Sequence, residues 1–135
     1  MGRLGDIMIK EEGSIIERIT LESKVEADVV VITFKGVFLL TDQVRLREVI
    51  HKYLQEGKAH FIFDFEDART IQSFVIGEIL ELSRKVKALK GDVCLVNLSD
   101  RMLYTMEITR VSEVTPTYFT YPEAMDYLHK MMADS

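Results

Sequence analysis

The sequence predicts a single α/β domain with a mixed, mainly parallel sheet of about five strands and about four helices. Three apolar runs, at residues 29–34, 61–65 and 93–96, have the composition of strands that are buried on both faces. Segments whose apolar residues recur at helical spacing lie between and after these runs. Strands that alternate with helices indicate a layered α/β fold. The chain has 135 residues, which is enough for one domain with a buried core.

The N-terminal part of the chain predicts an extension followed by an edge hairpin. Residues 1–14 are mixed in character and contain three glycines, so we expect a loose extension before a domain that spans residues 15–135. From residue 15 to residue 25 apolar and polar residues alternate, as in a half-buried strand with Ile19, Leu21, Ser23 and Val25 on its inner side. The run 29–34 follows after a short turn, so the two strands are expected to pair.

Four later segments carry the signals of helices, and one short segment those of a strand. Thr41 and Ser99 are expected as N-caps of the first and third helices, and Pro122 at the first helical position of the fourth. Ser73 is expected to cap the second helix, because its hydroxyl can accept from the free N–H groups of the first turn. Residues 114–120 suit a last edge strand, since Pro116 is tolerated at an edge.

The composition excludes several classes of protein. A net charge of −5 without a basic stripe argues against a nucleic-acid partner. The single cysteine, Cys94, lies among apolar strand residues, so neither an internal disulfide nor a cysteine nucleophile is expected. No run of about eighteen apolar residues is present, so we expect no membrane insertion. The N-terminus lacks the features of a secretory signal, which favours a cytoplasmic protein.

The sequence contains no pattern that demands an enzyme or a cofactor. His51, His60 and His129 lie on different predicted elements without metal-ligand spacing. No glycine-rich phosphate loop follows any strand, and the neighbours of Ser73 do not fit the strained elbow of a serine hydrolase. The acids of residues 64–67 are most simply a solvated turn. We therefore expect no catalytic residues, no metal and no cofactor.

Apolar residues gather where two parallel strands end, which is the edge at which α/β folds place their sites. Phe38, Leu39 and Leu40 follow one strand, and residues 74–76 open the helix after the next. Exposed apolar residues that cluster at one edge favour a protein-binding patch. We predict that the patch consists of Phe38, Leu39, Leu40, Gln72, Phe74, Val75 and Ile76. The alternative, that these residues pack on one another or on the last helix, stays open.

The strand, turn and helix of residues 60–82, together with the order of the elements, resemble the STAS family of anti-sigma factor antagonists. The family pattern is an apolar strand that ends in Asn/Asp-Leu, a short turn, and Asp-Ser-Ser/Thr-Gly-Leu-Gly at the start of a helix. Asp64 matches the strand end, Ser73 the first Ser, Ile76 the Leu and Gly77 the second Gly. The resemblance covers about residues 16–130.

Three positions of this chain depart from the family pattern. Gln72 stands in place of the Asp, Phe74 in place of the second Ser/Thr, and Val75 in place of the first Gly. The family's Gly-Glu-Leu-Asp after the second strand appears as Gly-Val-Phe-Leu at residues 36–39, without an acidic group. These changes make the surroundings of Ser73 more apolar than in the family.

The resemblance implies a role for Ser73. In the family the first Ser is the phosphoacceptor for a partner kinase that is also the anti-sigma factor, so the expected function is a non-enzymatic regulatory protein-binding module in signal transduction and transcription regulation. A phosphate on Ser73 would add about −1.5 to −2 charges at a helix N-terminus and block a docking partner. The alternative is a constitutive structural STAS subunit of a signalling assembly or a lipid-transport complex. A homodimer is left open.

Overall fold

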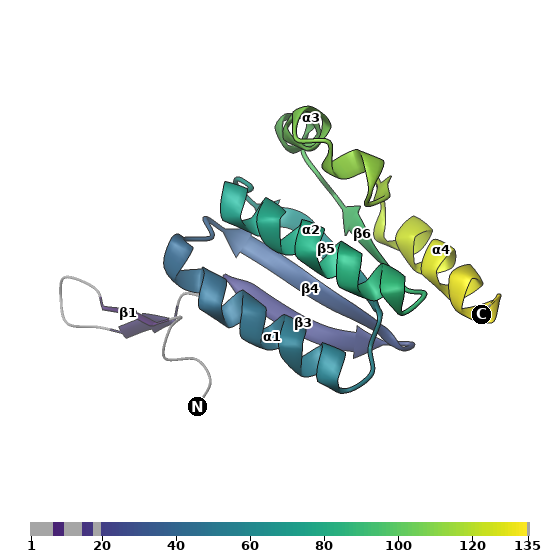
Figure 1. Cartoon of the computed structure of the whole chain (residues 1–135). Helices are drawn as coiled ribbons and strands as arrows, with labels where there is room; N and C mark the ends of the chain where they lie inside the picture. Colours follow the sequence, from purple (N-terminus) through teal and green to yellow (C-terminus); the bar gives the residue numbers. More distant parts are fainter. Residues whose placement is uncertain (1–6, 10–14, 18–19, 135) are drawn as a thin grey trace.

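The computed structural model describes residues 7–9, 15–17 and 20–134, and the main body is one five-stranded sheet (Figure 1). Its strands, in spatial order, are β3 (Leu21–Glu26), β4 (Val29–Gly36), β5 (His60–Ala68), β6 (Asp92–Val96) and β7 (Thr117–Tyr118). The first pair, β3 and β4, is antiparallel, and all later pairs are parallel. The predicted mixed, mainly parallel sheet with an opening hairpin is confirmed.

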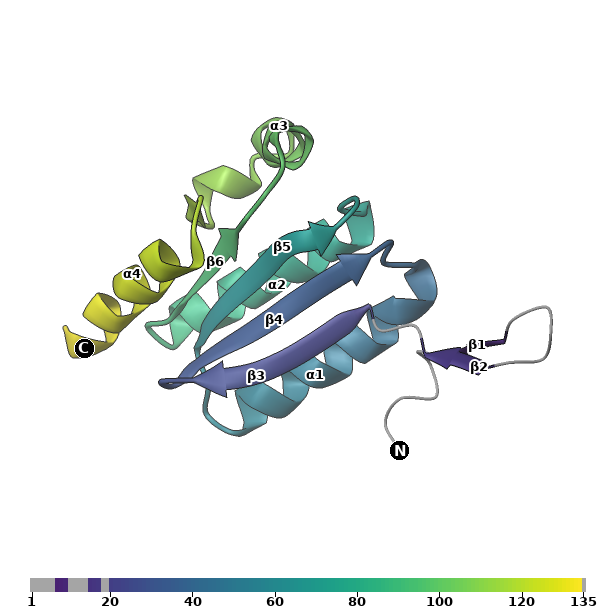
Figure 2. The same ribbon diagram turned by 180° about the vertical axis from the view of Figure 1, so that it is seen from behind.

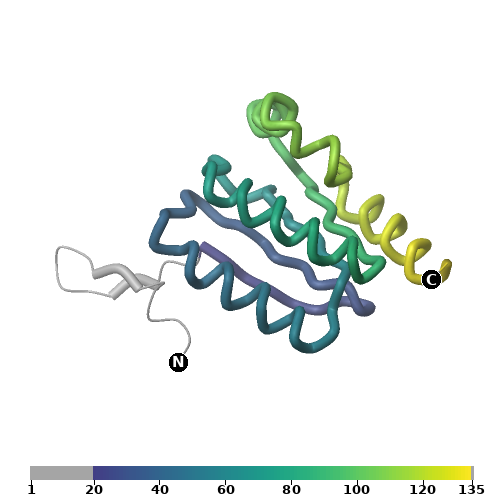
Figure 3. Tube along the Cα trace, in the orientation of Figure 1, coloured from purple at the N-terminus to yellow at the C-terminus, as the bar shows by residue number. Residues whose placement is uncertain are grey.

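Four α-helices cover the two faces of this sheet: α1 (Gln43–Gln55), α2 (Ser73–Ala88), α3 (Asp100–Ile108) and α4 (Tyr121–Ala133). Helices α1 and α2 run side by side over one face (Figure 3). Seen from behind, the strands lie in front of these two helices (Figure 2). The residues of α4 pack in a second cluster with those of the opposite face.

The central strand β5 is buried on both faces. Phe61, Phe63 and Phe65 belong to the core cluster under α1 and α2, and all three are at most 2% exposed. Ile62, between them in the sequence, packs on the other face in the cluster that contains Leu128 of α4. This alternation follows from the period of two in a strand. Burial of each such side chain stabilises the fold by roughly 1.5–3 kcal/mol.

The N-terminal strand differs from its prediction. Residues Ile15–Glu17 form β2, which pairs with β1 (Ile7–Ile9) as a separate two-stranded sheet, and the edge strand β3 begins only at Leu21. On the expected inner side Leu21 is buried, whereas Val25 is 43% exposed. Most of residues 1–14, and residue 19, lie outside the described residues, so the boundary between extension and domain stays a prediction.

The start of α1 corrects one predicted cap, and the start of α3 confirms another. Thr41 lies inside a short 3₁₀ turn, η2 (Leu40–Asp42), and α1 begins after Asp42, whose carboxylate accepts from the N–H of Leu39 at 2.7 Å. Ser99 caps α3 as expected, by accepting from the N–H of Met102 at 3.2 Å.

In the C-terminal part, the predicted strand 114–120 is reduced to the two residues of β7. A 3₁₀ turn, η3 (Val111–Glu113), and Pro116, which has no N–H to donate, leave little backbone before β7 for pairing. The next helix, α4, has Thr120 as its cap, and Pro122 is its second residue rather than its first.

A polar cluster lies at the amino ends of β5 and β6, where His60 and Asp92 are register partners. Asp92 is 4% exposed, and its carboxylate accepts from the hydroxyl of Tyr127 at 2.7 Å and from the N–H of Val93 at 2.8 Å. Burial lowers the pKa of His60 below its ordinary 6.5, against the opposing effect of Asp92, and His129 lowers it further. The folded protein therefore resists protonation of His60.

This depressed pKa predicts a loss of stability in mild acid. Below about pH 6.5 the unfolded chain takes up a proton at His60 that the folded chain resists, so the free energy of unfolding should decrease as the pH is lowered. Urea unfolding of wild type and His60→Gln, between about pH 7.5 and 5.5, measures this effect, and the variant should show the smaller decrease. The exposed His51 provides the control variant His51→Gln, which should behave as wild type. Equal decreases in wild type and His60→Gln would contradict the prediction.

Candidate protein-docking site

Ser73 is the first residue of α2 and not its cap. The N-cap position belongs to Gln72, whose backbone is extended and whose carbonyl accepts from the N–H groups of Val75 and Ile76 at 3.0 and 3.2 Å. The predicted capping role of Ser73 is therefore wrong: the helix begins one residue earlier than a Ser cap would require. The side chain of Ser73 is exposed, and no hydrogen bond from its hydroxyl is found among the described residues. This hydroxyl is accessible at the positive end of a 16-residue helix.

Two backbone and side-chain contacts position the carboxyl edge of the sheet. The N–H of Arg69 donates to the carbonyl of Gly36 at 2.8 Å, so the chain segments that leave β4 and β5 start side by side. Within β5, which continues to Ala68 and so includes the predicted turn residues 66–68, the Oδ1 of Asp64 accepts from the N–H of Glu66 and from the side-chain amide of Asn97, each at 3.0 Å. Asp64 thus joins the carboxyl half of β5 to the segment after β6.

Three of the seven residues predicted for the docking patch belong to the core instead. Phe38 is 3% exposed, Val75 1% and Ile76 8%. The ring of Phe38 packs on Phe34 with centroids 5.1 Å apart and stacks on Phe74 at 6.1 Å. For these residues the alternative prediction is confirmed: the apolar residues after β4 and at the start of α2 pack on one another.

The remaining predicted residues are at the surface to different degrees. Leu39 and Leu40 are 46% and 66% exposed, whereas Gln72 and Phe74 are half-buried. Val37 at 39% and Val44 at 62% extend the exposed apolar surface and were not predicted. We call Val37, Leu39, Leu40 and Val44 the apolar edge.

One of the missed residues had a signal in the sequence. Val44 follows Leu40 by four residues at the start of α1. A spacing of four places two residues on the same side of a helix, and Leu40 and Val44 are both exposed.

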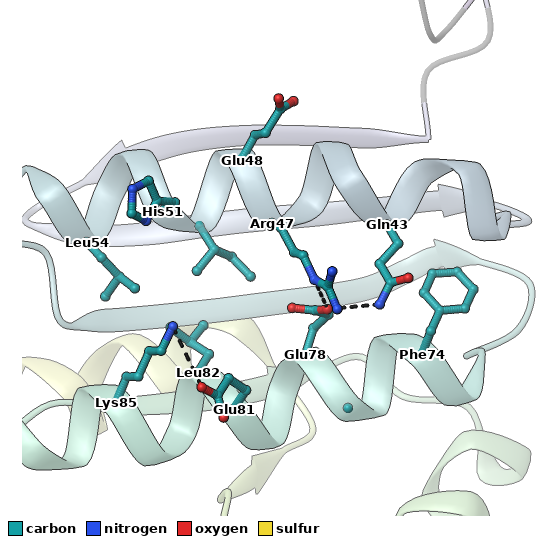
Figure 4. Close-up of a pocket in the computed structure, with 12 residues that line it drawn as sticks. Gln43, Arg47, Glu48, His51, Leu54, Phe74, Glu78, Glu81, Leu82 and Lys85 are labelled. Carbon is teal, nitrogen blue, oxygen red and sulfur yellow. Dashed lines mark hydrogen bonds and ion pairs between the residues drawn. The ribbon is translucent and has the colours of Figure 1, made fainter.

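A groove of about 790 Å³ runs between α1 and α2, and its lining begins on α2 at Phe74, the residue after Ser73 (Figure 4). Ile50, Leu54 and Leu82 contribute its apolar lining, and Phe74 lines one end. Across the groove, Glu78 accepts from the Nε of Arg47 at 2.6 Å and from the amide of Gln43 at 3.0 Å. Sequence reasoning missed this groove, because it depends on how two helices 18 residues apart in the chain pack together.

Of the groups considered for catalysis or metal binding, His51 lines the groove, whereas Cys94 lies in the strand β6. Cys94 is fully buried, and burial raises the pKa of its thiol to about 12, as expected for a strand residue that is not a nucleophile. Within the described part of the chain, no group of three or more His, Cys, Asp or Glu side chains is placed to hold a metal ion. None of the helices in the described residues has the length and apolar character needed to cross a bilayer.

Comparison with known proteins connects this geometry to a family. The family model described as STAS domain matches residues 20–124. A protein of Thermotoga neapolitana that carries the name of an anti-sigma factor antagonist, the TM1081 homolog, is 26% identical over 78 residues, which are 58% of this chain and 69% of that protein.

Solved structures show the same fold. The crystal structure of TM1081 from Thermotoga maritima superposes with a TM-score of 0.75 at 20% identity, over 81% of this chain and 94% of that one. The Bacillus cell fate determinant SpoIIAA in its phosphorylated form superposes with a TM-score of 0.65 at 23% identity, over 79% of this chain and 97% of that one.

The different burial of Leu40 and Phe74 predicts different responses to the same substitution. Leu40→Asp places a charge on an exposed side chain and should change the free energy of unfolding by no more than about 0.5 kcal/mol. Phe74→Asp removes the contact with Phe38 and brings a carboxylate against the core, which should cost about 2 kcal/mol or more. Denaturant unfolding of both variants measures the difference. A Phe74→Asp protein as stable as Leu40→Asp would show that Phe74 is not part of the core.

Proposed function

The chain belongs to the STAS domain family, and we propose that it is a regulatory protein-binding module whose partner, an anti-sigma factor of the serine-kinase type, docks beside Ser73 and phosphorylates it. The observation that carries this proposal is the accessible hydroxyl of Ser73 on the first residue of α2, next to exposed apolar residues. The name of the Thermotoga neapolitana relative supports the same class. In this proposal the chain is not an enzyme and acts in the cytoplasm.

The position of Ser73 supports a phosphoacceptor role. Its hydroxyl is exposed and does not cap the helix, so a kinase could reach it without disturbing α2. The N–H groups of the first helical turn have no partner within the helix, and with the helix dipole they favour a negative group at this end. A phosphate on Ser73 should therefore leave the fold intact.

The apolar edge supports a docking surface next to that hydroxyl. Leu39 and Leu40 follow β4, Ser73 follows β5, and the hydrogen bond between Arg69 and Gly36 holds the two connections together. A partner that covers the apolar edge would also come against Ser73. A phosphate of about −1.5 to −2 charges, strongly hydrated, would then have to be desolvated in the interface. Phosphorylation thus releases the partner by blocking the surface, without a large change of conformation.

The departures from the family pattern have a structural role that is separate from switching. Val75 is core, and Phe74 packs on Phe38, so the apolar substitutions anchor the start of α2 to the segment after β4. This anchoring is compatible with a phosphate on Ser73, whose side chain is exposed.

The second candidate is a constitutive structural subunit that binds its partner permanently. The exposure of Leu39, Leu40 and Val44 favours it, because exposed apolar surface is typical of lasting interfaces. The two candidates differ in whether the charge on Ser73 controls binding.

A Ser73→Glu variant tests the switch. The carboxylate lies at the N-terminus of α2, so the melting temperature should be unchanged or slightly raised, while affinity for the partner captured from native cells should fall at least about tenfold. Leu40→Asp should weaken the same complex. If Ser73→Glu binds as tightly as wild type while Leu40→Asp does not, the chain is a constitutive subunit and the switch is excluded.

Phosphorylation itself is tested with the captured kinase and ATP. We expect one phosphate per chain, detected by intact mass, and none on Ser73→Ala. Thr70→Ala is the matched control, because Thr70 is also exposed and lies three residues away in the same connection. Labelling that persists in Ser73→Ala would assign the phosphate to another residue.

A further inference from the structure

Gly77 is a glycine that the fold does not need. Of the four glycines in the described part of the chain, Gly36 and Gly57 have positive φ angles, and a Cβ on Gly91 would lie 1.8 Å from the carbonyl oxygen of Ala59. Gly77 has neither constraint: its φ is not positive, and a Cβ built on it meets no described atom within 4 Å. Glycine inside a helix is less stable than alanine. No contact within the described residues therefore requires a glycine at this position.

The place of Gly77 indicates what a glycine there allows. It lines the groove between α1 and α2, next to Phe74 and Glu78, one helical turn after Ser73. Because Gly77 has no side chain, the backbone of another molecule can approach the backbone of α2 closely at this position. On α2 the lining of the groove begins at Phe74, the residue after Ser73.

The dimensions of the groove suit a helix. Its lining extends from Gln43 to Leu54 on α1 and from Phe74 to Lys85 on α2. At 1.5 Å per residue each wall is roughly 16 Å long, which corresponds to about three turns of a helix laid along it. Leu54 and Phe74, both half-buried, present apolar surface along it, above the buried Ile50 and Leu82, and such surface is what an amphipathic helix covers in helix-in-groove recognition.

The charges of the groove indicate the sign of the occupant. Its two cations are engaged by acids of α2: Arg47 with Glu78 at 2.6 Å, and Lys85 with Glu81 at 3.7 Å. Glu48, on the rim of α1, is exposed, and the structure shows no ion pair for it within the described residues. Glu81 also pairs with Arg84, outside the lining, at 2.7 Å, so the excess negative charge of the groove is that of Glu48, and a basic residue of the occupant is complementary to it.

We propose that this groove receives an amphipathic helix of the partner, with apolar residues along one side, lysine or arginine beside them, and closest approach at Gly77. The proposal rests on the proposed function in that the helix belongs to the protein that docks beside Ser73. It does not depend on whether Ser73 is phosphorylated.

The probe is an amidated 14-residue helical peptide of leucine, lysine and alanine, with leucine at i, i+3, i+4 and i+7. The control peptide has the same sequence with glutamate in place of each lysine. Amide chemical shifts of the full chain are followed by NMR during titration with each peptide. The basic peptide should shift the amides that line the groove, among them Gly77 and Leu82, and the acidic peptide should bind at least about tenfold more weakly.

Substitution of Gly77 tests whether this residue serves peptide binding or the stability of the fold. Gly77→Ala should raise the melting temperature by about 2 to 5 °C and weaken the basic peptide at least about fivefold. Leu80→Ala, on the same helix but outside the groove lining, should leave the peptide affinity unchanged. The proposal is overturned if Gly77→Ala lowers the melting temperature, if it binds the peptide as wild type does, or if the shifts lie elsewhere or are absent. If Ser73→Glu binds the partner as wild type does while the basic peptide binds in the groove, the phosphorylation switch is rejected and the groove proposal stands.

Discussion

Strand β5 is covered on both faces, and this double burial sets the positions of the elements around it. Its three phenylalanines fill the layer under α1 and α2, while Ile62 packs on the side of α4. Its neighbours on both sides, β4 and β6, are parallel to it, and parallel sheets are typically covered on both faces. The connections that leave β4, β5 and β6 therefore emerge at one edge of the sheet, which is where Ser73 and the apolar edge lie.

The same core determines which surface residues are available for a partner. Phe38 and Phe74 stack across the two connections and close the core at this edge, so Leu39 and Leu40 are left facing the solvent. The hydroxyl of Ser73 is exposed because Phe74 and Val75, the next two residues, point inward and anchor the helix. At the start of α2, Phe74 and Val75 therefore stabilise the fold, while the neighbouring Ser73 is accessible to a partner.

The proposed phosphorylation and the proposed docking would use different parts of this surface, and their physical requirements differ. The first needs an accessible hydroxyl at a helix N-terminus, where a negative group is tolerated. The second needs apolar surface that a partner can bury, which the apolar edge and the groove between α1 and α2 supply. The ion pair between Arg47 of α1 and Glu78 of α2 joins the walls of the groove, so each of these two charges has a partner within the chain. A partner can then cover this pair without leaving either charge unmatched.

The sequence by itself determined the order of strands and helices, the buried character of β4, β5 and β6, and the family to which the strand and helix around Ser73 are similar. These features are local: apolar runs, periods of two or 3.6 residues and a short motif are visible without knowledge of distant neighbours. Only the tertiary structure decided that Phe38, Val75 and Ile76 are core while Val37 and Val44 are exposed, since burial depends on what packs against a residue. It also decided that Gln72, not Ser73, is the N-cap of α2, and that Gly77 opens a groove between helices distant in sequence.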